Sequence, residues 1–82
     1  PKHIEIAESL GGLGNCASAE SRFKEAEGLY ERALELLKKP EGGYFPGAYD
    51  ILKGYAAMMR AAKQDARAAG LEAQVRLMEI QR

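Results

Sequence analysis

Small and large apolar residues recur at spacings of three, four and seven between Ala7 and Leu36, and this spacing limits the possible folds more than any other property of the sequence. Side chains at such spacings lie on one face of an α-helix. The pattern is interrupted near Ser21. The segment therefore predicts two amphipathic helices that fold back on each other as a helical hairpin.

The first of these helices is predicted from about Ile4 to Ala19. The apolar stripe expected to face the core consists of Ile6, Leu10, Leu13 and Ala17. Gly11, Gly12 and Gly14 each cost about 1 kcal/mol of helix stability relative to alanine. We expect this cost to be offset by close approach of the second helix, which the absence of side chains allows. A phosphate-binding loop is a poor alternative, because LGGLGN lacks the required lysine and does not follow a strand.

The second helix is predicted to begin near Arg22, with the Ser21 hydroxyl as its N-cap, and to stop before Pro40. Its expected buried residues are Phe23, Ala26, Tyr30, Ala33, Leu34 and Leu37. The stretch PEGGYFPG at residues 40–47 then concentrates residues that break helices. We expect it to form a loop in which Tyr44 and Phe45 cover the junction between two hairpins.

A second helical hairpin is predicted after this loop. One helix is expected from about Pro46 to Ala62 and the other from about Asp65 to Ile80, with a break near Lys63. Their expected inward residues are Tyr49, Leu52, Tyr55, Ala56, Met59, Ala68, Leu71, Val75 and either Met78 or Leu77. The predicted organisation is a first repeat at residues 1–40, an inter-repeat loop at 41–47 and a second, terminal repeat at 48–82.

The two predicted hairpins align with a period of 42 residues, which pairs Gly14 with Ala56 and Ala26 with Ala68. The stretch HIEIAESLGGLG resembles the pattern His-Pro-x-Val-Ala-x-Ser-Leu-Asn-Asn-Leu-Ala of kinesin light chain-like tetratricopeptide repeats. RFKEAEGLYERALEL is similar to the Tyr-x-Glu-Ala-Glu-x-Leu-Tyr-x-Arg-Ala-Leu pattern of the same family. The second hairpin resembles the final repeat that closes many such arrays.

This resemblance implies an all-α fold in which two antiparallel helix-turn-helix hairpins stack as a short right-handed α-solenoid. The sequence departs from the family at both turns, where Ser21 and Lys63 replace glycine, and at Arg67, where the family commonly has glutamate. A non-glycine residue in a left-handed turn costs about 1 kcal/mol. We therefore expect the helix ends near these turns to shift by a residue or two.

The resemblance also implies a binding surface, because tetratricopeptide repeats hold partners on the concave face formed by the first helix of each hairpin. Carried over to this sequence, that face holds Glu8, Gly11, Asn15, Ser18, Ala19, Asp50, Lys53, Ala57, Arg60 and Ala61. The predicted partner-binding residues are Asn15, Ser18, Asp50, Lys53, Ala57 and Arg60. Asn15 matches an asparagine that clamps a C-terminal carboxylate in chaperone-binding members, but Gly11 stands where the clamp has lysine. Lys53 and Arg60 are candidates for pairing with an acidic partner.

Composition argues against several other functions. Twelve basic and twelve acidic residues cancel, so no overall field favours nucleic acid. His3 is the single histidine and Cys16 the single cysteine, which leaves no internal disulfide, no catalytic triad and no cysteine or two-histidine metal site. We expect neither enzymatic activity nor a cofactor. No run of about 18 apolar residues is present, so we expect no membrane insertion. The compartment is not indicated.

Two functions remain open at this point. The first is a protein-binding module that captures a partner segment on the concave face. The second is a structural subunit, or the terminal fragment of a longer array, docked permanently in a larger assembly. Two repeats fall short of the about three usually needed for independent stability, so we expect at most a marginally stable isolated monomer. Because the chain begins at Pro1 rather than Met, further repeats before it are also an open alternative.

Overall fold

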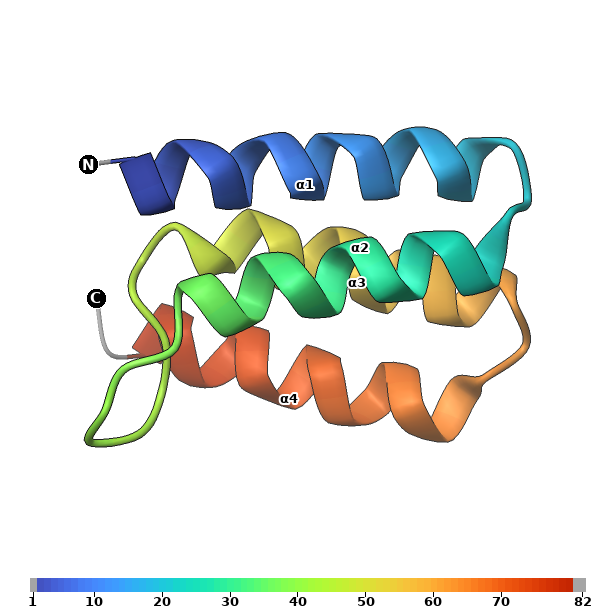
Figure 1. Ribbon diagram of the computed structural model, residues 1–82. Helices are drawn as coiled ribbons and strands as arrows, with labels where there is room; N and C mark the ends of the chain where they lie inside the picture. Colours follow the sequence, from blue (N-terminus) through green and yellow to red (C-terminus); the bar gives the residue numbers. More distant parts are fainter. Residues whose placement is uncertain (1, 81–82) are drawn as a thin grey trace.

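The computed structural model describes residues 2–80, and within this range the chain forms helices and no β-strand (Figure 1). The four helices are α1 (Lys2–Ala19), α2 (Phe23–Leu36), α3 (Ala48–Ala61) and α4 (Asp65–Ile80). The all-α prediction is therefore confirmed. The last helix has the predicted bounds, whereas α3 begins two residues after the predicted start at Pro46.

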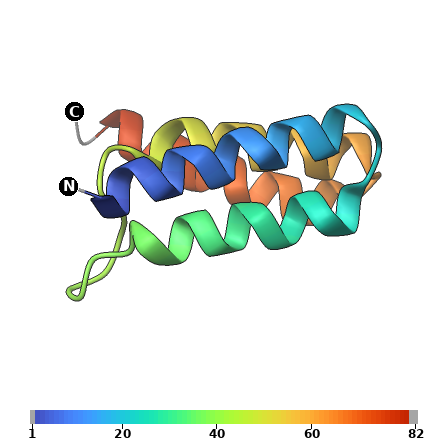
Figure 2. The ribbon, with the colours of Figure 1, turned by 45° about the horizontal axis from the view of Figure 1, so that its top comes forward.

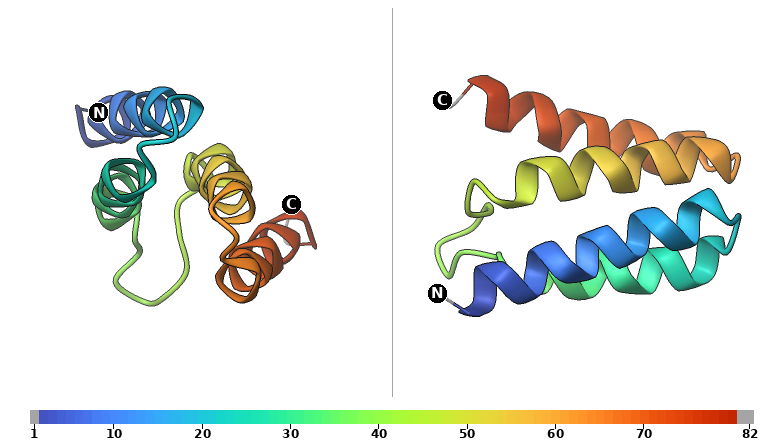
Figure 3. Two further views of the ribbon diagram at one scale, coloured as in Figure 1. Left: turned by 90° about the vertical axis from the view of Figure 1, so that its right-hand side faces the viewer. Right: turned by 90° about the horizontal axis from the view of Figure 1, so that it is seen from above.

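The helices form two antiparallel hairpins that stack on each other. Figure 2 shows α1 and α2 running side by side in opposite directions, and α3 and α4 form the second pair. Helix α3 contacts α1, α2 and α4, whereas the backbone of α4 lies close to that of α3 alone among the described helices. The end-on view in Figure 3 places α3 between the first hairpin and α4. The predicted stacking of two hairpins is thus confirmed.

Both hairpin turns contain a residue in the left-handed region, at Ser21 (φ 61°) and Lys63 (φ 66°). Each turn closes in the same way, since the N–H of Arg22 donates to the Ala17 carbonyl at 2.9 Å and the N–H of Gln64 donates to the Met59 carbonyl at 2.8 Å. This 6→1 hydrogen bond is typical of a helix C-terminus that ends on glycine. Ser21 and Lys63, which were expected at the two turns, therefore occupy the left-handed position of each turn.

The N-terminus of α2 differs from the prediction. Its N-cap is Arg22 and not Ser21, and no side chain caps the helix. Ser21 is in the left-handed conformation, which an N-cap residue does not adopt, so its hydroxyl is not placed on the first N–H groups. Arg22 instead pairs with Glu20 at 2.7 Å and with Glu25 at 2.8 Å. These exposed ion pairs tie the turn to the first turn of α2.

The core lies where α1, α2 and α3 meet. The stripe predicted for α2 is confirmed, because Ala26, Tyr30, Ala33, Leu34 and Leu37 are buried and Phe23 is half-buried. From the second hairpin the buried residues are Ala48, Ile51, Leu52, Tyr55, Ala56, Met58, Met59, Ala68 and Val75. Leu71 and Met78 of α4 are half-buried, whereas Leu77 faces solvent.

The stripe predicted for α1 is wrong in part. Ile6 and Leu13 are 50% and 56% exposed, and small residues take the inward positions: Ala7, Gly11, Gly14 and Ala17. The reason is the Tyr30 ring, which lies so close to α1 that a Cβ atom on Gly14 would sit 2.9 Å from Tyr30 Cε1. The close approach expected for the glycines is present, and Ile6 and Leu13 face outward, whereas Leu10 still packs against the core.

The connection between the hairpins folds back on the end of α2. The N–H of Phe45 donates to the Leu37 carbonyl at 2.8 Å, and the N–H of Lys39 donates to the Gly43 carbonyl at 2.9 Å. Gly42 and Gly43 have φ values of 107° and 77°, which only glycine adopts at low cost. Tyr44 is half-buried as expected, but Phe45 is 43% exposed and covers little of the junction.

Candidate protein-binding surfaces

The first helices of the two hairpins, α1 and α3, lie side by side and share one solvent-facing side, which we call the A face (Figure 3). The A face comprises the exposed or half-buried residues Glu8, Asn15, Ser18, Ala19, Asp50, Lys53, Ala57, Arg60 and Ala61. The helices meet through glycine, because a Cβ atom on Gly11 would lie 2.9 Å from Ile51 Cγ1. Gly11 is therefore buried and does not belong to the surface predicted to contain it.

Asn15 lies at the point where three helices meet. Its Oδ1 accepts a hydrogen bond from the Tyr30 hydroxyl of α2. On the other side, a Cβ atom on Gly54 of α3 would come within 2.6 Å of the same oxygen. The Asn15 carbonyl is thus used inside the molecule, and burial raises the pKa of its donor, the Tyr30 hydroxyl. Asn15 is exposed, so its NH₂ group is accessible at the surface.

Arg60 is also committed to an internal contact. Its guanidinium binds Glu72 of α4 through two hydrogen bonds, of 3.0 Å from Nε and 2.7 Å from Nη2. Asp65 lies 3.4 Å from Nη1. The hydrogen bond from Arg60 lowers the pKa of Glu72, so the pair stays ionised at neutral pH. Two acids already balance this guanidinium, which weakens the expectation that it binds an acidic partner.

The remaining predicted residues are more accessible. Lys53 Nζ lies 5.2 Å from the centroid of the Tyr49 ring, a cation–π contact at the surface. Asp50 and Ala57 are exposed and Ser18 is half-buried. Within the part of the chain that the structure describes, neither Glu8 nor Asp50 forms an ion pair. Among the described residues, the A face therefore offers the carboxylates of Glu8 and Asp50 without an ion pair, together with Lys53 and the small side chain of Ala57.

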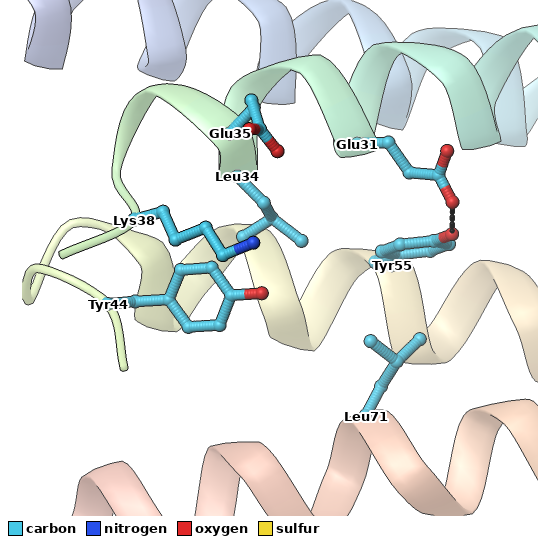
Figure 4. A pocket seen from close by; sticks show the side chains of 7 residues that line it. All are labelled: Glu31, Leu34, Glu35, Lys38, Tyr44, Tyr55 and Leu71. Carbon is cyan, nitrogen blue, oxygen red and sulfur yellow. Dashed lines mark hydrogen bonds between the residues drawn. The ribbon is translucent and has the colours of Figure 1, made fainter. Parts of the chain in front are cut away.

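A pocket of about 280 Å³ lies on the opposite side of the molecule, beneath the connecting loop (Figure 4). Its lining residues are Glu31, Leu34, Glu35, Lys38, Tyr44, Tyr55 and Leu71. The Tyr55 hydroxyl donates to Glu31 Oε2 at 2.9 Å, as Figure 4 shows. Burial and this hydrogen bond raise the pKa of the Tyr55 hydroxyl.

Arg67 extends the contact between the hairpins. Its Nη2 lies 2.6 Å from Glu27 Oε2 and 3.3 Å from the Tyr55 hydroxyl. Sequence reasoning marked Arg67 only as a departure from the family pattern. The sequence does contain a basic residue in α4 and acidic residues in α2 that could pair. The spacing of residues along the chain, however, does not show which side chains of different hairpins meet. The polar cluster around Tyr55 thus joins α2, α3 and α4.

A second pocket, of about 310 Å³, lies between α3 and α4. Lys53, Ala56, Ala57, Glu72, Val75, Arg76 and Glu79 line it. Most of its rim is charged. The surface of α1 at the opposite end of the molecule is less polar, because Ile6, Leu13 and Cys16 are exposed there.

Comparison with family models, with curated proteins and with solved structures found no match to this chain. The tetratricopeptide resemblance therefore stays a prediction that depends on the residues. None of the described helices combines the length and the apolar character needed to cross a membrane. Among the described residues, no three side chains of His, Cys, Asp or Glu are grouped so that they could hold a metal ion.

Proposed function

We propose that this chain is a non-catalytic protein-interaction module of tetratricopeptide type, and that a partner segment binds on the A face. One observation carries the proposal. Helices α1 and α3 pack closely at two glycines, because the Ile51 side chain lies against Gly11 and the Asn15 side chain lies against Gly54. An extended or helical segment can then lie across both helices at once, which is how helical repeats bind their partners.

The charges of the A face favour a basic partner segment. The sequence suggested Lys53 and Arg60 as contacts for an acidic partner, but Arg60 is bound to Glu72 and Asp65. Glu8 and Asp50 have no such counterpart among the described residues. Complementary charge at an interface increases specificity and the association rate more than affinity. Lysine or arginine in the partner is therefore expected opposite Glu8 or Asp50.

The proposal is tested by selecting peptides from a random displayed library and measuring their affinity by fluorescence polarisation. Ala57→Arg places a long cation on the A face, and we expect it to raise the Kd of the selected peptides at least tenfold. Ala73→Arg is the matched control, because Ala73 is also exposed in mid-helix but belongs to α4. Equal affinity of the wild-type protein and Ala57→Arg would remove the A face as the binding surface.

A second candidate is a structural subunit held permanently in a larger assembly. The observation that favours it is the exposure of two large aliphatic side chains, Ile6 and Leu13, on one side of α1. Size-exclusion chromatography with circular dichroism separates the candidates. A monomer that melts cooperatively supports the binding module, whereas an oligomer or a molten chain supports the docked subunit.

A further inference from the structure

The face with which α3 packs on the first hairpin is repeated on α1, where it is unoccupied within the described chain. On α3, this face consists of the buried residues Ala48, Ile51, Tyr55 and Met58. Ile51 lies against Gly11, and Tyr55 stacks on Tyr30. The residues 42 positions earlier are Ile6, Ser9, Leu13 and Cys16. All four are exposed, and we call them the α1 outer stripe.

The groove that receives α3 is also repeated, but with changed chemistry. Gly11, Tyr30, Leu34 and Leu37 of the first hairpin form its apolar surface beside α3. The equivalent residues 42 positions later are Lys53, Glu72, Arg76 and Glu79. These four line the pocket between α3 and α4. The second hairpin is therefore closed to another apolar helix at the position where the first hairpin accepts one.

We propose that the α1 outer stripe docks on a helical hairpin whose two helices form an apolar groove like that between α1 and α2. The stripe has the same helical spacing as the α3 residues that make this contact. The interface of α3 with the first hairpin therefore shows which kind of groove the stripe fits. A second copy of the chain is a poor occupant, because its free groove is the charged one between α3 and α4. In that groove Glu72 takes the place of Tyr30, so Leu13 would be buried against a carboxylate instead of an aromatic ring.

This surface is separate from the A face, so the inference goes beyond the proposed function. It also gives the molecule a direction. The α1 end exposes Ile6 and Leu13 and receives a hairpin, whereas the α3–α4 end is charged and is closed to another apolar helix. Terminal units of helical repeat proteins require a polar outer face of this kind for solubility.

The test is a fusion in which a second copy of residues 1–42 precedes the full chain and so offers the known apolar groove in register with its α1. The added copy carries Cys16→Ala, so the only thiol is Cys16 of the full chain. Its equivalent on α3, Met58, is fully buried and lies three residues after Tyr55 on the same side of the helix. We therefore expect the reaction of Cys16 with a soluble disulfide reagent to be at least tenfold slower in the fusion than in the 82-residue chain.

Leu13→Lys in the full-length part of the fusion supplies the control. Leu13 is 56% exposed in the single chain, so this change should leave the helicity and melting of the 82-residue protein unaltered. In the fusion it should restore fast labelling of Cys16. Equal labelling rates of the fusion and the single chain, whatever the helicity of the added copy, would overturn the proposal. Slower labelling of the single chain at rising concentration, with a dimer in light scattering, would overturn it in favour of a second copy.

Discussion

The rings of Tyr30 and Tyr55 stack with their centroids 5.2 Å apart and their planes inclined by 15°, and this contact joins the two hairpins. Each hydroxyl reaches a different neighbour, since Tyr30 donates to Asn15 of α1 and Tyr55 donates to Glu31 of α2. One aromatic pair therefore links three helices, and offset stacking contributes about 1 kcal/mol beyond the area that the rings bury.

Removal of the Tyr30 ring is expected to unfold much of the protein. Tyr30→Ala leaves a cavity beside Gly14 and Tyr55, and loss of a buried aromatic side chain costs about 3–5 kcal/mol in the free energy of unfolding. Tyr30→Phe keeps the ring and removes only the hydrogen bond to Asn15, at a cost of about 1 kcal/mol. Urea denaturation followed by circular dichroism measures both. Similar losses for the two variants would contradict the role assigned to the ring.

Two glycines of α1 are expected to respond to alanine in opposite directions. A Cβ atom on Gly14 would lie 2.9 Å from the Tyr30 ring, so Gly14→Ala should lower the free energy of unfolding by about 1–3 kcal/mol. Gly12 has no atom within 4 Å of the same position, and Gly12→Ala should raise it by about 1 kcal/mol through helix propensity. Thermal and urea melts of both variants check this. Stabilisation by Gly14→Ala would show that α1 and α2 are less close.

Glycine at the second turn should stabilise the protein. Lys63 has φ 66°, a conformation that costs a side chain about 1 kcal/mol, so Lys63→Gly is expected to raise the free energy of unfolding by about that amount. The control Lys63→Ala removes the same long side chain but keeps a Cβ atom, and its stability should stay near that of the wild-type protein. An equal gain from both variants would assign the effect to the lysine side chain instead.

Alkaline pH is expected to destabilise the protein through Tyr55. Burial, followed by the hydrogen bond to Glu31, raises the pKa of its hydroxyl in the folded state above the ordinary value of 10.0. The neutral form is thus favoured by folding, and its contribution is complete below about pH 10 and is lost as the pH rises through the folded pKa. Tyr55→Phe should flatten this part of the urea midpoint profile between pH 8 and 11. Parallel profiles for wild-type and variant proteins would refute the assignment.

Much of the fold was predictable because the sequence features that indicate it lie within single helices and turns. The apolar spacing of α2 identifies its buried side, and Pro40 and the glycines after it end the hairpin. Ile6 and Leu13 of α1 were predicted on the wrong side because α1 carries two candidate faces, one of large residues and one of small ones. Which face packs inward depends on the Tyr30 ring of another helix, and periodicity within one helix does not contain that information.

The candidate surface was predictable to a smaller extent. Asp50, Ala57 and Lys53 lie on the exposed side of α3, where the resemblance placed them. The contacts of Asn15 and Arg60 were missed, because their neighbours Tyr30 and Glu72 are brought close only when the helices fold back. Which residues of two helices pair depends on how the helices pack against each other, and the spacing of residues along one helix does not show this.

Helix α3 is the only helix whose backbone lies close to that of α4 in the described chain. Local opening is easiest where an element has few neighbours, so we expect α4 to open before the other three helices separate. The amide hydrogens of α4 should consequently exchange with deuterium earlier than those of α2. We expect the contacts of Arg67 with Glu27 and Tyr55 to oppose this opening, because they join α4 to α2 and α3.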